Sequence, residues 1–304
     1  MWQRKHLLGI GELSADDIRE ILDKAQNYRQ TALDEDKSSN AFAGKRVVLM
    51  FFENSTRTRV SFELAAERIG ASVTAMSMDT SSVKKGESMF DTVRTIDAMG
   101  FDCMVIRHGS SGVPWQASRA VSASVVNAGD GTHEHPTQAL LDMLTIRQHK
   151  TRIEGLRVGI IGDILHSRVA RSNVIGLKKL GAGVVLIGPP TLVPDSFRAM
   201  GAEINYDLDD AIHQCDVLML LRIQTERLGG QSFPSIREYC HFYRLDRARM
   251  LRARPDVLVM HPGPINRGVE ISPEVADGAN AVILEQVSNG VAVRMAVLDI
   301  LMQG

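Results

Sequence analysis

The chain is 304 residues long, which allows one large domain or two domains of about 150 residues each. Its hydrophobic content of 44% and its charged content of 23% are ordinary for a soluble globular protein. The formal net charge of −1 argues against a nucleic-acid binder that works by bulk electrostatics, so any basic site must be local.

The cysteines and the N-terminus indicate the compartment. The sequence has no C-x-x-C pair, and its three cysteines are widely spaced, so we expect neither a structural zinc site nor a disulfide framework. The N-terminus lacks the apolar stretch of a signal peptide, and no apolar run approaches the roughly 18 residues that span a bilayer. We therefore expect a cytoplasmic protein without membrane contact.

Patterns typical of strands and helices alternate along the chain. They predict helices over 14–33, 55–69, 88–99, 113–120, 132–149, 168–180 and 284–301, and strands over 47–52, 73–78, 103–106, 125–126, 156–161, 184–187, 217–221 and 257–260. Alternation of this kind predicts an α/β protein in which each sheet is mainly parallel and has helices on both faces.

The pattern restarts near residue 150, which predicts two domains. The first covers 1–150 and the second covers 151–283. The last helix, about 284–304, has apolar residues at helical spacing, and we expect it to return and pack on the first domain.

One stretch has the features of an anion site. Six apolar residues, 47–52, predict a strand buried on both faces, and Ser55 follows as a candidate N-cap of the next helix. A helix N-terminus attracts anions through its unpaired N–H groups and its dipole. Three hydroxyls and two arginines lie within residues 55–59, and arginine suits phosphate, so we expect a phosphate group there. The alternative is a capped surface helix with solvated arginines.

Further polar residues follow other predicted strands. In open parallel sheets, ligands bind beyond the carboxyl ends of the strands, so we expect these residues to converge on one cleft between the domains. They are mostly arginine, amide and histidine, which suits binding and polarising one or more small anions. The set is Arg107, His135 with Gln138, Arg168, Arg222 with Gln224, and 261–264. Taken singly, His135 could be structural, and the arginines could be solvated.

Other chemistries fit the sequence less well. A serine nucleophile motif G-x-S-x-G and a P-loop are both missing. Gly159 and Gly162 after a strand lack the third glycine and the first spacing of a dinucleotide motif. The run His133-Glu134-His135 resembles a metal cluster, but it is not H-E-x-x-H, and Pro136 indicates a helix start at that point. We expect no metal and no cofactor.

Together these motifs resemble a known family. The stretch Phe52-Glu53-Asn54-Ser55-Thr56-Arg57-Thr58-Arg59 with Ser61-Phe62-Glu63 is similar to the carbamoyl-phosphate signature of the aspartate/ornithine carbamoyltransferases. The similarity runs from about residue 46 to the C-terminus, with at least six motifs in the right order. It implies that Ser55, Thr56, Arg57 and Thr58 bind the phosphate and that Thr58, Arg107, His135 and Gln138 hold the carbamoyl group.

The resemblance also implies a binding site for the second substrate and active sites that are shared between subunits. Arg168, Arg222 and Gln224 resemble the family's aspartate-binding set, and the backbone carbonyls of Pro262 and Gly263 would orient the attacking amine. In the family, a loop corresponding to the one with Ser81 and Lys85 reaches the site of a neighbouring subunit. The resemblance therefore implies a homotrimer whose active sites are shared between subunits, and Lys85 would touch both substrates.

The second substrate can be narrowed to a dicarboxylate. Two arginines, Arg168 and Arg222, can each take one carboxylate and would repel a cationic side chain. Ornithine-using members usually carry His-Cys-Leu-Pro where this chain has His261-Pro262-Gly263-Pro264. Gly263 is smaller than the residue many members have there, but the family uses the backbone carbonyl. The branch of the family that uses aspartate therefore fits best.

The resemblance implies direct transfer from carbamoyl phosphate to L-aspartate, giving N-carbamoyl-L-aspartate and phosphate in pyrimidine biosynthesis. No covalent enzyme intermediate is required. Glu53 resembles an interdomain residue and is expected to bridge to Arg168 and Arg227 in a closed form. The alternatives are transfer to ornithine or an N-acylated amine, and a non-catalytic paralogue that binds anions or acts as a scaffold. Regulatory chains or another pathway enzyme remain open as partners.

Overall fold

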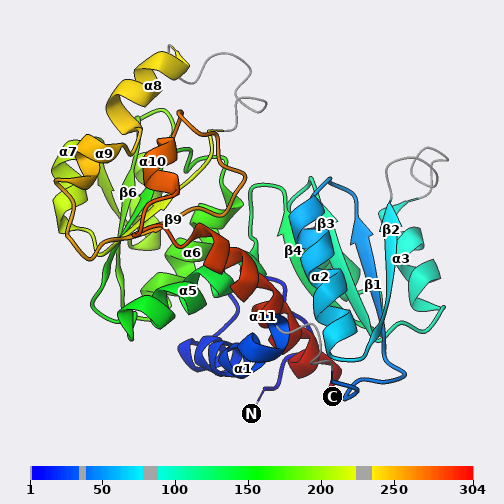
Figure 1. The fold of residues 1–304 in the computed structure, drawn as a ribbon. Coiled ribbons are helices and arrows are strands. Elements are labelled where there is room, and N and C mark those ends of the chain that lie inside the picture. The colour runs from blue at the N-terminus through cyan, green and yellow to red at the C-terminus, as the bar shows by residue number, and fades with distance from the viewer. Residues whose placement is uncertain (1, 34–38, 78–87, 224–234, 304) are drawn as a thin grey trace. The chain divides into compact units, whose positions relative to one another are not determined.

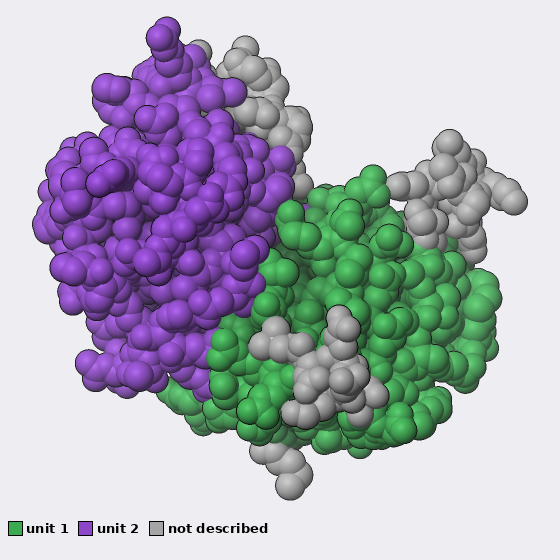
Figure 2. All heavy atoms as spheres, in the orientation of Figure 1, with its two compact units in different colours: residues 1–144, 287–304 green, residues 145–286 purple. Residues whose placement is uncertain are grey.

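A computed structural model describes residues 2–33, 39–77, 88–223 and 235–303. The chain separates into two compact units, Met1–Leu144 with Val287–Gly304 and Thr145–Gln286 (Figure 2). In the part of the chain that is described, no helix is long and apolar enough to cross a membrane.

The first unit contains a four-stranded parallel sheet in the order β2-β1-β3-β4 (Figure 1). Its elements are α1 (Ala15–Leu33), β1 (Arg46–Phe51), α2 (Thr56–Arg68), β2 (Ser72–Ser77), α3 (Met89–Asp97), β3 (Cys103–His108), α4 (Val113–Ser118) and β4 (Ser124–Asp130). Most of α5 (Pro136–Lys150) and of α11 (Ile283–Met302) also belongs to this unit.

The second unit contains a five-stranded parallel sheet in the order β7-β6-β5-β8-β9. Its elements are β5 (Arg157–Ile161), α6 (Arg168–Lys179), β6 (Gly183–Ile187), η2 (Asp195–Met200), β7 (Glu203–Asn205), α7 (Leu208–Ala211), η3 (Ile212–Gln214), β8 (Val217–Leu220), α8 (Ile236–Tyr243), α9 (Arg247–Met250), β9 (Leu258–Met260) and α10 (Pro273–Ala276). The predicted α/β class, with two mainly parallel sheets and their helices, is confirmed.

The core of the first unit explains why β1 is apolar throughout. Val48 and Met50 point to one face of the sheet, where they pack with residues of α3 and α4 such as Val93 and Ala117. The alternate residues of β1 are also buried, and α2 lies against the sheet beside β1 and β2 (Figure 1). A strand covered on both faces cannot alternate between apolar and polar residues.

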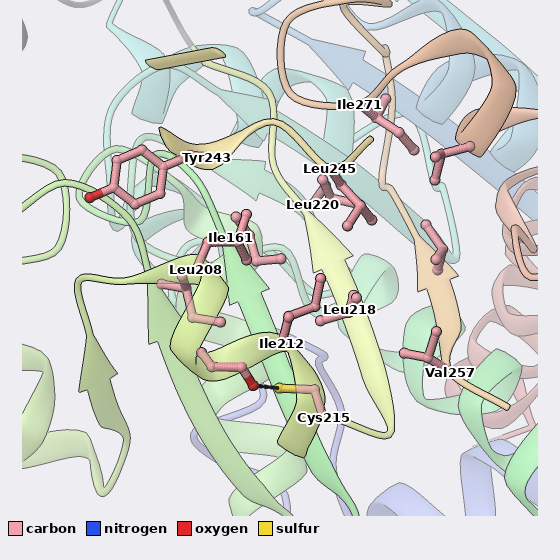
Figure 3. Packing of buried hydrophobic residues seen from close by; sticks show 14 of the residues in the cluster. Ile161, Leu208, Ile212, Cys215, Leu218, Leu220, Tyr243, Leu245, Val257 and Ile271 are labelled. Atoms are coloured by element: carbon pink, nitrogen blue, oxygen red, sulfur yellow. Dashed lines mark hydrogen bonds between the residues drawn. The ribbon is translucent and has the colours of Figure 1, made fainter. Parts of the chain in front are cut away.

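The second unit has a core built from its strands and from short helices late in the chain. Ile161, Leu218 and Leu220 pack with Leu208 and Ile212 in Figure 3. In the same cluster the thiol of Cys215 donates to the carbonyl of Ala211 at 3.4 Å, and burial raises the pKa of this thiol to about 11. The cysteine therefore packs as a small apolar side chain.

Some elements differ from the sequence prediction. The strand expected at 125–126 runs from Ser124 to Asp130, because its polar residues are buried and hydrogen-bonded rather than solvated. The prediction did not include η2, β7 or the short helices α7 to α10. These elements have three to eight residues, too few for a period to be recognised.

Candidate active site

The junction between β1 and α2 is the place where the sequence predicts an anion site. Ser55 is the N-cap of α2, and its backbone is extended with φ −158°. Its hydroxyl donates to the Thr58 hydroxyl at 3.0 Å and, in the described residues, accepts no backbone N–H of the first turn. The first turn therefore keeps backbone N–H groups that the cap does not use, as an anion site requires. Thr58 is buried, whereas Arg57 and Thr56 are exposed at the helix start.

A buried arginine of α11 anchors α2. The guanidinium of Arg294 donates to the Ser61 hydroxyl and to the Gly290 carbonyl, both at 2.9 Å, and lies 5.0 Å from the centre of the Phe62 ring. Burial lowers its pKa to about 9, so the group remains cationic at neutral pH. Sequence reasoning missed this residue because it lies in an apolar helix, 233 positions from Ser61.

Arg107 lies beside this junction. It faces Phe51 across the β1–β3 ladder, and its carbonyl accepts the N–H of Phe52 at 2.9 Å. Its guanidinium donates to the carbonyl of Ala128 at 3.0 Å and to Glu53 Oε1 at 3.3 Å. The side chain is only 10% exposed. Bonds from two sides therefore fix the orientation of this cation at the carboxyl edge of the sheet.

Asp130 at the end of β4 organises the following loop. Its carboxylate accepts the N–H of Gly112 at 2.7 Å, the Asn127 side-chain amide at 2.8 Å and the N–H of Glu134 at 3.1 Å. Burial by itself would raise the pKa of Asp130, but hydrogen bonds from His133, Gly112 and Asn127 outweigh it and lower the pKa. The ionised carboxylate thus holds the loop that carries His135.

Glu134 ties this loop to the N-terminal segment. Its two carboxylate oxygens accept the N–H groups of Ile10 at 2.8 Å and Gly11 at 3.1 Å. A Cβ on Gly9 would lie 2.4 Å from Glu134 Oε1, so a larger residue there would displace this carboxylate. Glu134, which lies between the two histidines of the run 133–135, therefore holds the N-terminal segment by hydrogen bonds.

His135 occupies the predicted place directly before α5, and Pro136 is the first helical residue. The carbonyl of His135 accepts the N–H groups of Gln138 at 3.1 Å and Ala139 at 3.2 Å. The Gln138 amide donates to Asp142 Oδ1 at 2.9 Å. Both side chains are buried at the same sheet edge as Arg107, because β3 and β4 are neighbouring parallel strands.

In the second unit, Arg168 begins α6. The hydroxyl of Ser167 accepts the N–H of Ala170 at 3.1 Å and caps the helix. Before it, the buried Asp163 carboxylate accepts the backbone N–H of His166 at 3.2 Å and lies 2.8 Å from Nδ1 of the same histidine. The turn after β5 also needs Gly162, whose φ is +127° and whose Cβ would meet the Leu221 carbonyl at 2.7 Å. Close backbone packing accounts for this glycine without a dinucleotide.

The other candidate residues of this unit follow the strands β8 and β9. Arg222 comes two residues after β8, and the N–H of Leu221 before it donates to the Ile161 carbonyl at 2.8 Å. Pro262 and Gly263 follow β9, and both are half-buried. Since β5, β8 and β9 are neighbours in the sheet, these residues and Arg168 lie at one carboxyl edge.

Four predicted residues, Ser81, Lys85, Gln224 and Arg227, lie outside the described residues. The remaining candidates form two sets, each at the carboxyl edge of its own unit's sheet. Both sets combine arginine with hydrogen-bond donors, which suits binding and polarising small anions. Within the described ranges, no group of three or more His, Cys, Asp and Glu side chains is arranged to hold a metal ion.

Two parallel-sheet units, each with a cationic set at the carboxyl edge of its sheet, fit an enzyme that acts on small anions, and comparison with family models identifies the class. Residues 5–148 match the model of the aspartate/ornithine carbamoyltransferase carbamoyl-P binding domain. Residues 154–301 match that of the aspartate/ornithine carbamoyltransferase Asp/Orn binding domain. The chain therefore belongs to the aspartate/ornithine carbamoyltransferase family.

Individual relatives narrow the resemblance to the aspartate branch. The aspartate carbamoyltransferase catalytic subunit of Gluconobacter oxydans is 55% identical over 296 residues, covering 97% of this chain and 95% of the relative. That of Syntrophotalea carbinolica is 54% identical over 303 residues, with 100% and 97% covered. The crystal structure of Trypanosoma cruzi aspartate transcarbamoylase with carbamoyl phosphate and aspartate superimposes with a TM-score of 0.87 at 31% identity, covering 96% and 95%. The predicted resemblance is confirmed.

Proposed function

We propose that this chain transfers the carbamoyl group of carbamoyl phosphate to the α-amine of L-aspartate. The observation that carries this proposal is the presence of two sets of anion-binding residues, one in each unit. One is an anion-binding helix start beside a fixed, buried Arg107. The other contains two arginines, Arg168 and Arg222, at neighbouring strand ends. Relatives that cover nearly the whole chain are named for this activity, which supports the assignment.

In this proposal the first unit binds carbamoyl phosphate. The phosphate is held by Ser55, Thr56, Arg57 and Thr58, where the start of α2 favours negative charge. The carbonyl oxygen of the carbamoyl group accepts hydrogen bonds from Thr58, Arg107 and His135, and Gln138 contacts the same group. Ser81 and Lys85 complete the phosphate site from a neighbouring subunit.

The second unit binds aspartate in this proposal. Arg168 and Arg222 each take one carboxylate, and Gln224 adds a polar contact. The carbonyls of Pro262 and Gly263 accept hydrogen bonds from the amine and aim its lone pair. Glu53, which pairs with Arg107 in this structure, exchanges that partner for Arg168 and Arg227 on substrate closure.

The reaction needs no nucleophile from the protein. The neutral α-amine forms a bond to the carbamoyl carbon, and the carbon–oxygen bond to phosphate breaks with its electron pair leaving on phosphate. The proton that the amine loses passes to the departing phosphate. Negative charge grows on the carbonyl oxygen, and Arg107, whose guanidinium is held by Ala128 and Glu53, stabilises it in this proposal. Holding both substrates in attacking geometry contributes up to roughly 7–11 kcal/mol.

The test is a carbamoyl-transfer assay with aspartate and ornithine side by side. We expect N-carbamoyl-aspartate and phosphate in equal amounts, and less than about a hundredth of that rate with ornithine, because two arginines would repel a cationic side chain. Turnover only with ornithine would overturn the substrate assignment. A properly folded chain with no turnover on either amine would favour the scaffold alternative.

We also propose that the chain works as a homotrimer with shared sites. Two inactive variants, Lys85→Ala and His135→Ala, damage different subunits' contributions to one site. Mixed trimers would then contain some sites with both residues intact. We expect partial recovery of activity on mixing, measured after subunit exchange has been verified by mass. No recovery after verified exchange would contradict shared sites.

The wider assignment follows from the same reaction. N-carbamoyl-L-aspartate is a precursor in pyrimidine biosynthesis, and we place the enzyme in the cytoplasm. The relatives are named catalytic subunits, which supports assembly with regulatory chains or another pathway enzyme. Size measurement of the protein purified from its native cells, against the recombinant chain, would test that assembly.

A further inference from the structure

A fully buried histidine and glutamate stand directly behind the turn at Pro262–Gly263. His261 is the first residue after β9, and its Nε2 lies 3.0 Å from Glu270 Oε1. Both side chains are 0% exposed. The same glutamate oxygen also accepts the N–H of Asn266 at 2.6 Å, so it joins the two ends of the loop 261–270.

Hydrogen bonding assigns the proton on the histidine ring. The backbone N–H of Gly263 donates to Nδ1 of His261 at 2.8 Å, so Nδ1 must be an acceptor. The proton of a neutral imidazole is then on Nε2, where it is donated to Glu270. One ring thus links the N–H of Gly263 to a carboxylate nine residues further along the chain.

These bonds fix the turn on both sides of Pro262. The N–H of His261 donates to Oε1 of the buried Gln286 at 2.9 Å, and the N–H of Gly263 is held by the imidazole. Gly263 has φ +67°, a conformation that favours glycine. Within the described residues, neither the Pro262 nor the Gly263 carbonyl accepts a hydrogen bond. Both N–H groups are therefore held inside the unit, while the two carbonyls are left for a ligand.

We propose that His261 and Glu270 are positioning residues that hold the Pro262 and Gly263 carbonyls in place for the attacking amine. This inference rests on the proposed function, since it assigns the turn to the amine of aspartate. The pair touches no substrate itself. It acts on the reaction only through the backbone, and its loss therefore affects aspartate and leaves carbamoyl phosphate binding unchanged.

Two variants of His261 distinguish the roles of its two ring nitrogens. His261→Gln places an amide donor near the former Nε2 but removes the acceptor for the N–H of Gly263. His261→Asn keeps an acceptor at the place of Nδ1 and loses the link to Glu270. A buried donor without a partner is costly, so we expect the Gln variant to raise the aspartate KM on the order of 10- to 100-fold. We expect a smaller rise, about 3- to 10-fold, for the Asn variant.

Two glutamate variants test whether an acceptor is sufficient. Glu270→Gln retains an oxygen that accepts from both the ring and Asn266, and we expect its aspartate KM to stay within about threefold of wild type. Glu270→Ala removes that oxygen, and we expect a rise on the order of 10-fold or more. Rescue by the conservative variant indicates positioning by hydrogen bonds rather than by charge.

A matched control is available in the same unit. His149 Nε2 also lies 3.0 Å from a carboxylate, Glu285 Oε2, but at the exposed surface. We expect His149→Asn to leave both KM values and kcat unchanged. The control shows that losing a histidine–carboxylate pair is harmless where no substrate-binding turn depends on it.

The experiment measures both KM values, kcat and thermal stability for wild type and all five variants. A rise in the aspartate KM for His261→Gln and Glu270→Ala, with their carbamoyl-phosphate KM within about twofold of wild type, supports the proposal. The proposal is overturned if His261→Gln and Glu270→Ala lower stability or kcat while the aspartate KM stays within twofold, or if they raise both KM values equally. A wild-type chain inactive with aspartate would instead overturn the proposed function, which this readout shows separately.

Discussion

In the first unit, hydrogen bonds and strand register fix the candidate arginine, Arg107. In the second unit, the candidate residues lie at a helix start and beside a backbone turn. Arg107 is buried and bonded to Ala128 and Glu53, next to the end of β1. Arg222 is half-buried and follows the end of β8, beside the turn at Pro262. We therefore propose that the first unit receives transition-state charge and that the second recognises and aims the amine.

Arg107→Ala gives the largest expected effect. In the proposed reaction the variant removes a donor to the developing oxyanion, and loss of such a donor typically lowers kcat by about 10²- to 10³-fold. It also leaves the Ala128 carbonyl and Glu53 without this cation. Steady-state kinetics with aspartate measure the loss, and Arg119→Ala, whose guanidinium stacks on the exposed Trp115, serves as control. A kcat within fivefold of wild type would remove Arg107 from the chemistry.

Arg168→Ala tests the other half of the comparison. Loss of one guanidinium–carboxylate pair should raise the aspartate KM about 10- to 100-fold, while the carbamoyl-phosphate KM changes little. Arg168→Lys should recover only part of the affinity, because a single ammonium cannot form a paired contact. If both KM values changed together, the division of labour between the units would be wrong.

Asp130→Asn tests the support behind the first site. An amide cannot replace both acceptor oxygens, so one of the N–H donors of Gly112 and Glu134 loses its partner. We expect a loss of about 1–2 kcal/mol in the free energy of unfolding, measured by denaturant titration. The aspartate KM should stay near wild type, since this carboxylate belongs to the first unit. No loss of stability would show that the network is dispensable.

The Asp130 carboxylate also makes the stability difference between wild type and Asp130→Asn depend on pH. Its folded pKa lies below the value of 3.8 for an unperturbed aspartate, so it stabilises the folded state above that value. This stability is lost as the pH falls through the lower, folded pKa. The stability gap between wild type and Asp130→Asn should therefore be constant above about pH 5 and shrink below about pH 4. Asp97 and Asp102 have lowered pKa values too, but they are present in both proteins. A gap that widened in acid would contradict this sign.

Local patterns predicted most of the fold and the positions of the candidate residues at strand ends. The apolar runs of β1 and β3 and the helix starts at Ser55 and Arg168 depend on neighbours in the sequence, so one chain is enough to recognise them. The helix start at Pro136, directly after His135, was predicted for the same reason.

The missed features depend on contacts between distant residues. Arg294 donates to Ser61, which is 233 positions earlier in the sequence, and Glu134 accepts the N–H of Ile10, which is 124 positions earlier. The pair of His261 and Glu270 spans only nine positions, but an irregular loop joins them, so no period reveals it. Residues that support a site behind its ligands carry no local signature, and the folded chain is needed to find them.

The central claim is direct transfer of the carbamoyl group to the amine of aspartate, and isotopic labelling tests it most directly. Carbamoyl phosphate labelled with ¹³C at the carbamoyl carbon is incubated with ¹⁵N-aspartate and the purified chain. We predict a product with a one-bond ¹³C–¹⁵N coupling in its NMR spectrum and no ¹³C retained on the protein. A product without that coupling, or a ¹³C label bound covalently to the protein during turnover, would contradict the account.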